Sequence, residues 1–153
     1  MRALRRANIP ATKEPTGLLR GDGKLPDGLS LVPWQSRRRL TWDAAVVDTF
    51  ASSYISSTST TPGGAAEAAA TRKSSKYSSI NQTHIFIQVD LETMRPINAE
   101  GLCFWNEQGE RLISVSGDTR ESSFMFQQLA ILVQRFNMVA FRGTFTSETD
   151  IGD

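Results

Sequence analysis

The chain has 153 residues, of which 39% are hydrophobic and 22% charged, and its formal net charge at pH 7 is +1. This length and composition predict one compact domain, and no apolar run approaches the ~18 residues of a membrane-spanning helix. The single cysteine, Cys103, excludes an internal disulfide or a multi-cysteine zinc site, and the single histidine, His84, excludes any site that needs two.

The near-neutral net charge is the sum of two unequal segments. Residues 1–40 carry nine lysines and arginines against three acids, a net of +6. Residues 41–153 carry eight basic and thirteen acidic residues, a net of −5. Such asymmetry is typical of a chain with one polyanion-binding end, and a solvated basic tail is the alternative for residues 1–15.

The N-terminal third predicts an irregular segment followed by two strands. Residues 1–20 are basic and interrupted by proline and glycine, so we expect them to be mostly irregular, and they lack the apolar stretch of a secretory signal. Residues 29–34 form a short apolar strand in which Pro33 indicates a strand end or a sheet edge. Residues 40–47, rich in β-branched and aromatic side chains, predict a second strand that pairs antiparallel with the first.

A loop, a helix and the strongest strand signal follow. Residues 51–61 are rich in serine and threonine and predict a loop. Thr61 as N-cap and Pro62 as the first helical residue predict the start of an alanine-dense helix that runs to Tyr77. Residues 83–91 alternate, so that four apolar side chains share one face: Ile85, Ile87, Val89 and Leu91.

The last third predicts two helices and a tail. Residues 97–115 have helical character, and residues 120–141 hold the longest helix, which is apolar on more than one side. The order β-β-α-β-α-α predicts a single α/β domain over residues 21–145, with a central mixed β-sheet flanked by helices, and a flexible acidic tail over residues 146–153.

Two aspartates of the predicted strand pair form a candidate metal pocket. Asp27 lies in the turn Pro26-Asp27-Gly28 at the open end of the first strand, and Asp43 lies within the second strand among apolar residues. A carboxylate in that setting requires a cation, a donor or water. Two converging carboxylates suit Mg²⁺, which takes one or two carboxylates plus waters and phosphate oxygens. The alternatives are that Asp27 is a turn residue and that Asp43 faces solvent on an edge strand.

The following helix adds basic groups to this candidate pocket. Lys73 and Lys76 share one face, and Ala66 and Ala69 precede them on that face, which lets the helix approach the sheet. A lysine there would reach the strand carboxylates and neutralise charge on a phosphate. Both lysines could equally be solvated surface charges. Lys24 and the turn Arg37–Arg39 are expected to lie close to the same pocket, where phosphate contacts would dominate affinity for a polyanion.

The ordered set of motifs resembles a known nuclease family. Pro26-Asp27, then Asp43 in a valine-ending strand, then Lys73-Ser-Ser-Lys76-Tyr77 on a helix is similar to the restriction-like endonuclease domain of site-specific non-LTR retrotransposons. That domain belongs to the PD-(D/E)XK superfamily and lies C-terminal to the reverse transcriptase. From Ile9 to Phe145 the chain also resembles invertebrate proteins that look like detached copies of this region.

The resemblance implies a fold and a set of roles. It implies a restriction-endonuclease-like fold in which Asp27 and Asp43 hold Mg²⁺ or Mn²⁺ and DNA phosphodiester bonds are hydrolysed, leaving a nick. The superfamily's usual lysine, two residues after the strand acid, is absent, because that position is Ala45. In the subfamily that the chain resembles, the role of this lysine has moved to the helix, which implies Lys76 first and Lys73 second, with Tyr77 packing against the site or orienting it.

The expected partners and the alternatives follow from the same resemblance. Lys24, Arg37, Arg38 and Arg39 would contact DNA, and the protein would be intracellular, nuclear if functional, with no membrane and no small-molecule cofactor. Two other interpretations stay open. The chain could be a catalytically inactive nucleic-acid-binding remnant, or the product of a pseudogene of a reverse transcriptase open reading frame.

Overall fold

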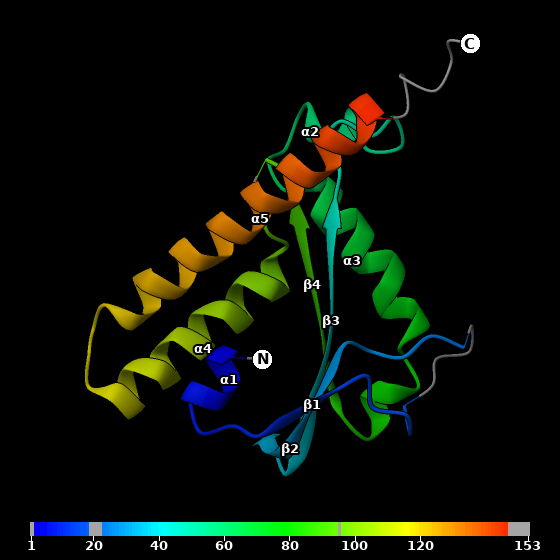
Figure 1. The fold of residues 1–153 in the computed structure, drawn as a ribbon. Helices are drawn as coiled ribbons and strands as arrows, with labels where there is room; N and C mark the ends of the chain where they lie inside the picture. The colour runs from blue at the N-terminus through cyan, green and yellow to red at the C-terminus, as the bar shows by residue number, and fades with distance from the viewer. Residues whose placement is uncertain (1, 19–22, 95, 147–153) are drawn as a thin grey trace.

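The structure is a computed structural model and describes residues 2–18, 23–94 and 96–146, so the predicted tail lies outside the described residues apart from Thr146. Among the described residues, no helix is long and apolar enough to cross a membrane. Figure 1 shows the elements, which in chain order are α1 (Arg2–Arg6), β1 (Ala11–Lys13), β2 (Gly28–Gln35), β3 (Arg38–Val47), α2 (Ile55–Thr58), α3 (Gly64–Lys76), the 3₁₀ turn η1 (Ile80–Gln82), β4 (Ile85–Glu92), α4 (Ala99–Ser116) and α5 (Glu121–Thr146).

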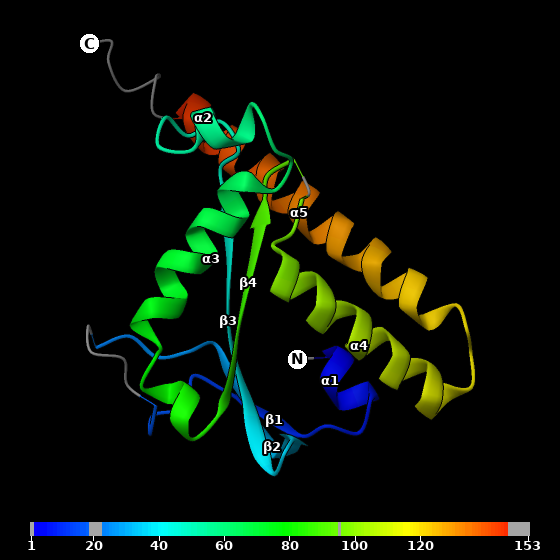
Figure 2. The same ribbon diagram turned by 180° about the vertical axis from the view of Figure 1, so that it is seen from behind.

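Four strands form one mixed sheet in the order β1-β2-β3-β4. The predicted pairing of β2 with β3 is antiparallel, as expected, whereas β3 and β4 run parallel, from Leu40 opposite Ile85 to Val47 opposite Glu92. A parallel pair needs a crossover, and the connection through α3 supplies it. Figures 1 and 2 show α3 on one face of the sheet and α1, α4 and α5 on the other. The predicted fold class, an α/β domain with a mixed sheet flanked by helices, is therefore confirmed.

The N-terminal segment departs from the prediction. Residues 2–6 form α1 and residues 11–13 form β1, so the expectation of an irregular segment is wrong there. Leu4, Ala7 and Ile9 are buried in the main hydrophobic core. A five-residue helix is unstable alone. Its packing against α4, where the Gln108 side-chain amide donates to the Ala3 carbonyl at 3.2 Å, explains why it forms here.

Strand β4 is buried on both faces, as is usual for a strand paired in parallel and covered by helices. Three of its predicted inward residues, Ile87, Val89 and Leu91, pack in the main core with side chains of α4 and α5, including Phe104 and Val133. The opposite face carries the four side chains that turn toward α3: Phe86, Gln88, Asp90 and Glu92. The site described below is built on this second face.

The β2–β3 hairpin is longer than predicted. Strand β2 continues through Pro33 to Gln35, and the turn falls at Ser36 and Arg37, whose φ angles of 49° and 59° are left-handed. β1 pairs only with residues 28–30 of β2. Pro33 therefore lies on a stretch without that neighbour, where its missing N–H leaves no ladder bond unmade.

Helix α3 begins later than the Thr61-Pro62 signal predicts. Its first residue is Gly64 and its N-cap is Gly63, with φ 82°, which has no side chain to accept a hydrogen bond. The carboxylate of Glu92 on β4 accepts from the N–H groups of Ala65 at 2.8 Å and Ala66 at 3.1 Å instead. Because the capping group is Glu92 of β4, the local Thr61-Pro62 signal did not predict the start of the helix correctly.

Replacing Gly28 by alanine is expected to destabilise the domain by about 3 kcal/mol or more. Gly28 lies opposite Trp42 in the β2–β3 ladder, and an added Cβ would lie 2.0 Å from the indole Cζ2. A urea titration of unfolding measures the change. Gly17→Ala is the matched control, because an added Cβ there meets nothing within 4 Å. Equal stability of the two variants would contradict the predicted clash.

Candidate active site

Asp27 is attached to the strand that carries the second aspartate. It precedes β2, is exposed, and its Oδ2 accepts a hydrogen bond of 2.7 Å from the N–H of Ala44. Ala44 follows Asp43 directly, so this bond brings the two carboxylates to the same place on the sheet. The ladder explains the arrangement, because Gly28 pairs with Trp42 and so sets Asp27 beside the next residues of β3.

Asp43 is largely buried in the middle of β3, with its side chain 15% exposed. Burial raises the pKa of its carboxyl group, and the negative charge of Asp27 raises it further. Lys73 and a hydrogen bond from Gln88 act in the opposite direction. The pKa of Asp43 is raised on balance, so the protein holds a carboxylate where its charge is poorly compensated. A divalent cation would relieve that imbalance.

Lys73 is the cation of this cluster. It projects from α3 toward the sheet, with Nζ 3.6 Å from Asp43 Oδ2 and 3.2 Å from Asp90 Oδ1. The helix comes this close because the residues on its inner side are small and buried: Ala65, Ala66, Ala69 and Ala70. The alanine stripe predicted for this face therefore allows α3 to approach the sheet closely, as expected.

Lys76 and Tyr77 lie beside Lys73 but are held differently. Lys76 is exposed, and no ion pair joins it to another of the described residues. Tyr77 is 1% exposed and stacks on Phe86 of β4 with ring centroids 4.1 Å apart. The structure thus sets Lys73, ranked second from the sequence, nearest to the aspartates, and sets Tyr77 as a packing residue between α3 and β4.

Two residues of the cluster were missed from the sequence. Asp90 is fully buried, and its Oδ1 accepts both from Lys73 and from the side-chain amide of Gln88, the latter at 2.7 Å. Gln88 Oε1 and Asp90 Oδ2 are buried and have no hydrogen-bond partner. The available signal was the spacing of Gln88, Asp90 and Glu92, three polar residues on one face of the most apolar strand, since buried polar groups require partners.

These groups open into a cavity of about 590 Å³ between the start of β2 and the end of α3. The lining combines acidic and basic side chains with backbone of the preceding loop: Glu14, Gly23, Lys24, Leu25, Asp27, Asp43, Lys73, Lys76 and Tyr77. Both predicted aspartates, both predicted helix lysines and Lys24 therefore line one cavity.

The three arginines Arg37, Arg38 and Arg39 are not among the residues that line this cavity. Arg37 lies in the β2–β3 turn, and Arg38 and Arg39 begin β3, whereas Asp27 and Asp43 lie at the open end of the same hairpin. Arg39, Arg38 and Arg37 precede Asp43 by four, five and six residues, which is about 13 to 20 Å of extended strand. Arg38 instead donates to the Asn81 carbonyl at 3.1 Å. The basic segment is contiguous in sequence, but the hairpin carries its arginines away from the cavity.

The donor set fits a hard divalent cation in its chemistry. Among the described residues no group of three or more His, Cys, Asp or Glu side chains is arranged as a metal site. Mg²⁺ needs fewer, because it keeps several waters and takes one or two carboxylates together with substrate phosphate oxygens. Asp27 and Asp43 supply those two carboxylates.

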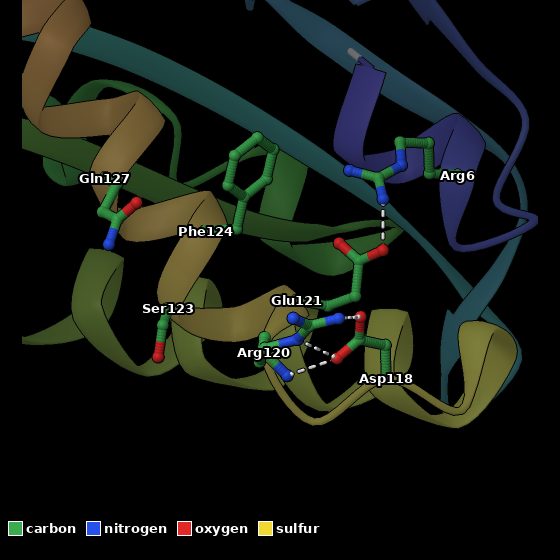
Figure 3. A pocket seen from close by; sticks show the side chains of 7 residues that line it. All are labelled: Arg6, Asp118, Arg120, Glu121, Ser123, Phe124 and Gln127. Carbon is green, nitrogen blue, oxygen red and sulfur yellow. Dashed lines mark hydrogen bonds and ion pairs between the residues drawn. The ribbon is translucent and has the colours of Figure 1, made fainter.

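A second cavity, of about 480 Å³, lies at the start of α5 and has a different character. Figure 3 shows Arg6 of α1 reaching Glu121, and Arg120 folded onto Asp118. Hydrogen bonds from Arg120 lower the pKa of Asp118 to about 2. Each charged side chain that lines this cavity is thus matched by an opposite charge, and nothing there resembles the carboxylate pair.

Searches with this chain matched no protein-family model and no curated protein sequence. The geometry of the site therefore carries the functional inference.

Proposed function

We propose that this domain is a divalent-metal-dependent DNA endonuclease of the restriction-like type, which hydrolyses a phosphodiester bond and leaves a nick. One observation carries the proposal. The carboxylates of Asp27 and Asp43 line one cavity with Lys73, whose ammonium lies 3.6 Å from Asp43. Two carboxylates and a lysine that line one cavity suit the cleavage of a phosphate ester.

Asp27 and Asp43 are the residues that would hold Mg²⁺ or Mn²⁺. The metal, when bound, supplies a Lewis acid that activates water and neutralises charge on the phosphate. Lys73 would provide a fixed positive charge next to the scissile phosphate. Asp90 positions Lys73 through an ion pair, and Gln88 donates a hydrogen bond to Asp90. Ala44 keeps Asp27 in place through its N–H group.

Two further lysines support a polyanionic substrate. Lys24 and Lys76 line the same cavity from the loop before β2 and from the end of α3. Phosphate contacts of this kind supply affinity that falls steeply with salt and depends little on sequence. We therefore expect DNA binding by this face to weaken as ionic strength rises.

A catalytically inactive nucleic-acid-binding remnant is the second candidate. It is favoured by Ala45, which stands two residues after Asp43, where the wider superfamily's pattern has lysine. In this candidate Lys24, Lys73 and Lys76 bind the DNA backbone but no bond is broken. The two candidates differ in one observable, the appearance of nicked DNA.

Nicking of supercoiled plasmid by the purified chain tests both. We expect nicking with Mg²⁺ or Mn²⁺ and none with EDTA. Lys73→Met is expected to lower the rate by about 10²-fold or more, as loss of a preorganised charge-stabilising group does. The matched variant Lys76→Met, on the next helical turn and exposed, is expected to lower it by less than about tenfold.

Three outcomes separate the candidates. Nicking that persists in EDTA, or that is equal in wild type and Lys73→Met, contradicts the proposed site. Salt-dependent DNA binding without nicking favours the inactive remnant. A double variant, Asp27→Asn with Asp43→Asn, purified in parallel, controls for a contaminating nuclease.

A further inference from the structure

Helix α5 carries an apolar face that no element of the described part of the chain covers. Its inner side packs on the core, where Met125 and Val133 are buried, and Figures 1 and 2 show it as the outermost helix on that side of the sheet. Seven large apolar side chains of the described part of α5 are exposed, and five of them share its outward side: Phe124 (50%), Ile131 (53%), Leu132 (60%), Met138 (57%) and Val139 (71%). These five fall within about 120° of the helix circumference. Phe136 and Phe141 lie outside this sector, one on each side.

The spacing along this face is seven residues. Phe124, Ile131 and Met138 form one row, and Leu132 and Val139 form a second row beside it. Gln128 and Arg135 lie between these two rows, so the face is not the a/d seam of a coiled coil. Its residues four apart form ridges of the kind that pack between the ridges of a second helix.

Four of the five side chains are arranged symmetrically about a centre between Ile131 and Leu132, and Met138 is the exception because its counterpart, Met125, is buried. In an antiparallel pair of identical helices centred there, Phe124 of one copy meets Val139 of the other, at seven and a half residues on either side of the centre. Ile131 meets Leu132 in the same way. A two-fold axis requires this kind of self-complementarity, because the same patch serves both subunits.

The polar residues of the face select the same orientation. Gln128 and Arg135 are exposed between the two apolar rows, three and a half residues on either side of the centre. Antiparallel pairing sets Gln128 opposite Arg135, which can form a hydrogen bond. Parallel pairing would set Arg135 against Arg135 and Arg142 against Arg142, and like charges in contact destabilise a pair.

The area of the face is sufficient for a specific interface. Five apolar side chains with roughly 100 Å² exposed each, together with the aliphatic stems of Gln128 and Arg135, present about 700 Å². A standard protein interface buries about 800 Å² per partner.

We propose that two copies of this chain form a two-fold dimer through antiparallel packing of α5 against α5, centred between Ile131 and Leu132. This goes beyond the proposed nuclease function and does not depend on it. The candidate active site lies across the sheet, on the side covered by α3, so dimerisation leaves both cavities open to DNA.

Sedimentation velocity of the full chain between about 1 and 100 µM is the test. We expect a concentration-dependent dimer that becomes a monomer in Ile131→Glu with Leu132→Glu. Both residues are more than half exposed, so the variant should stay folded, which circular dichroism checks. Val115→Glu, at a position on α4 that is 47% exposed, should leave the dimer intact.

Cross-linking tests the register. In a Cys103→Ser background, Gln128→Cys and Arg135→Cys are expected to form a mixed disulfide when combined, while each alone stays uncross-linked. Self-cross-linking of Gln128→Cys, or a wild type that is monomeric throughout the range, would overturn the proposal. So would a monomer that binds vesicles of phosphatidylcholine and phosphatidylserine through this face.

Discussion

Asp43→Asn is expected to abolish nicking and, at neutral pH, to raise the thermal stability of the domain. Burial, and then the nearby charge of Asp27, raise the pKa of Asp43, so its ionised form is disfavoured in the folded protein. Asparagine keeps the shape without the charge. A gain of 1 kcal/mol would raise the melting temperature by about 2–4 °C, whereas nicking should fall by at least about 10²-fold because a metal-holding carboxylate is lost.

The pH dependence follows from the direction of this shift. The stability contribution of a carboxyl group whose pKa is raised on folding is fully present below its unfolded pKa, about 3.9, and is lost as pH rises through the folded pKa. The stabilisation of Asp43→Asn over wild type should therefore be largest near pH 7 and vanish near pH 3. Thermal melts across that range measure it.

Asp48→Asn is the matched control for this experiment. Asp48 is an exposed aspartate just after β3, and its Oδ1 accepts from the Phe50 N–H at 3.0 Å, a role that asparagine can fill. It should alter neither nicking nor stability. An Asp43→Asn variant that melts below wild type at pH 7 would contradict the view that the ionised carboxylate is held at an unfavourable position.

Glu92→Leu is expected to destabilise the domain by about 3 kcal/mol and to lower nicking with it. Glu92 is 1% exposed and accepts two hydrogen bonds at the start of α3, where a negative charge also complements the helix dipole. Without this cap the first turn of α3 leaves two buried N–H groups unpaired. Lys73 lies on the same helix, so the site loosens as well.

Glu92→Gln separates the hydrogen bonds from the charge. Glutamine keeps one acceptor oxygen, so we expect a smaller loss, of about 1–2 kcal/mol. Urea denaturation of wild type and both variants gives the free energies of unfolding. Glu110→Leu, at an exposed position on α4, should change stability by less than about 0.5 kcal/mol. A Glu92→Leu variant as stable as wild type would show that the carboxylate does not hold the helix.

Features with a local signal were predictable from the sequence. The β2–β3 pair, the apolar face of β4 and the long helix α5 each follow from residue pattern, and Asp27 could be set near Asp43 because a hairpin brings them together. Features held by distant partners were not. Helix α1 exists through its packing on α4, and the start of α3 is determined by Glu92, more than twenty residues further along the chain.

The site was predicted in part for the same reason. Lys73 is predictable because it follows a stripe of alanines on one helix, whereas its buried partner Asp90 lies on the polar face of a strand whose strongest signal is its apolar face. The arginines of the hairpin turn are near Asp43 in sequence but do not line the cavity, because an extended strand separates them from it. A strand moves the chain about 3.3 Å per residue away from its start.

The parallel pairing of β3 with β4 has a consequence for folding. Leu40 and Ile85, which open the ladder, are 45 positions apart in the sequence. Asp43 and Lys73 come together only across the α3 crossover that this ladder holds in place. The chain loses conformational entropy when it closes so long a loop, and the stabilising contacts of the ladder form only afterwards. This slows folding. The β2–β3 hairpin, whose partners are near in sequence, can form earlier. We therefore expect the lysine–carboxylate cluster to assemble after the hairpin.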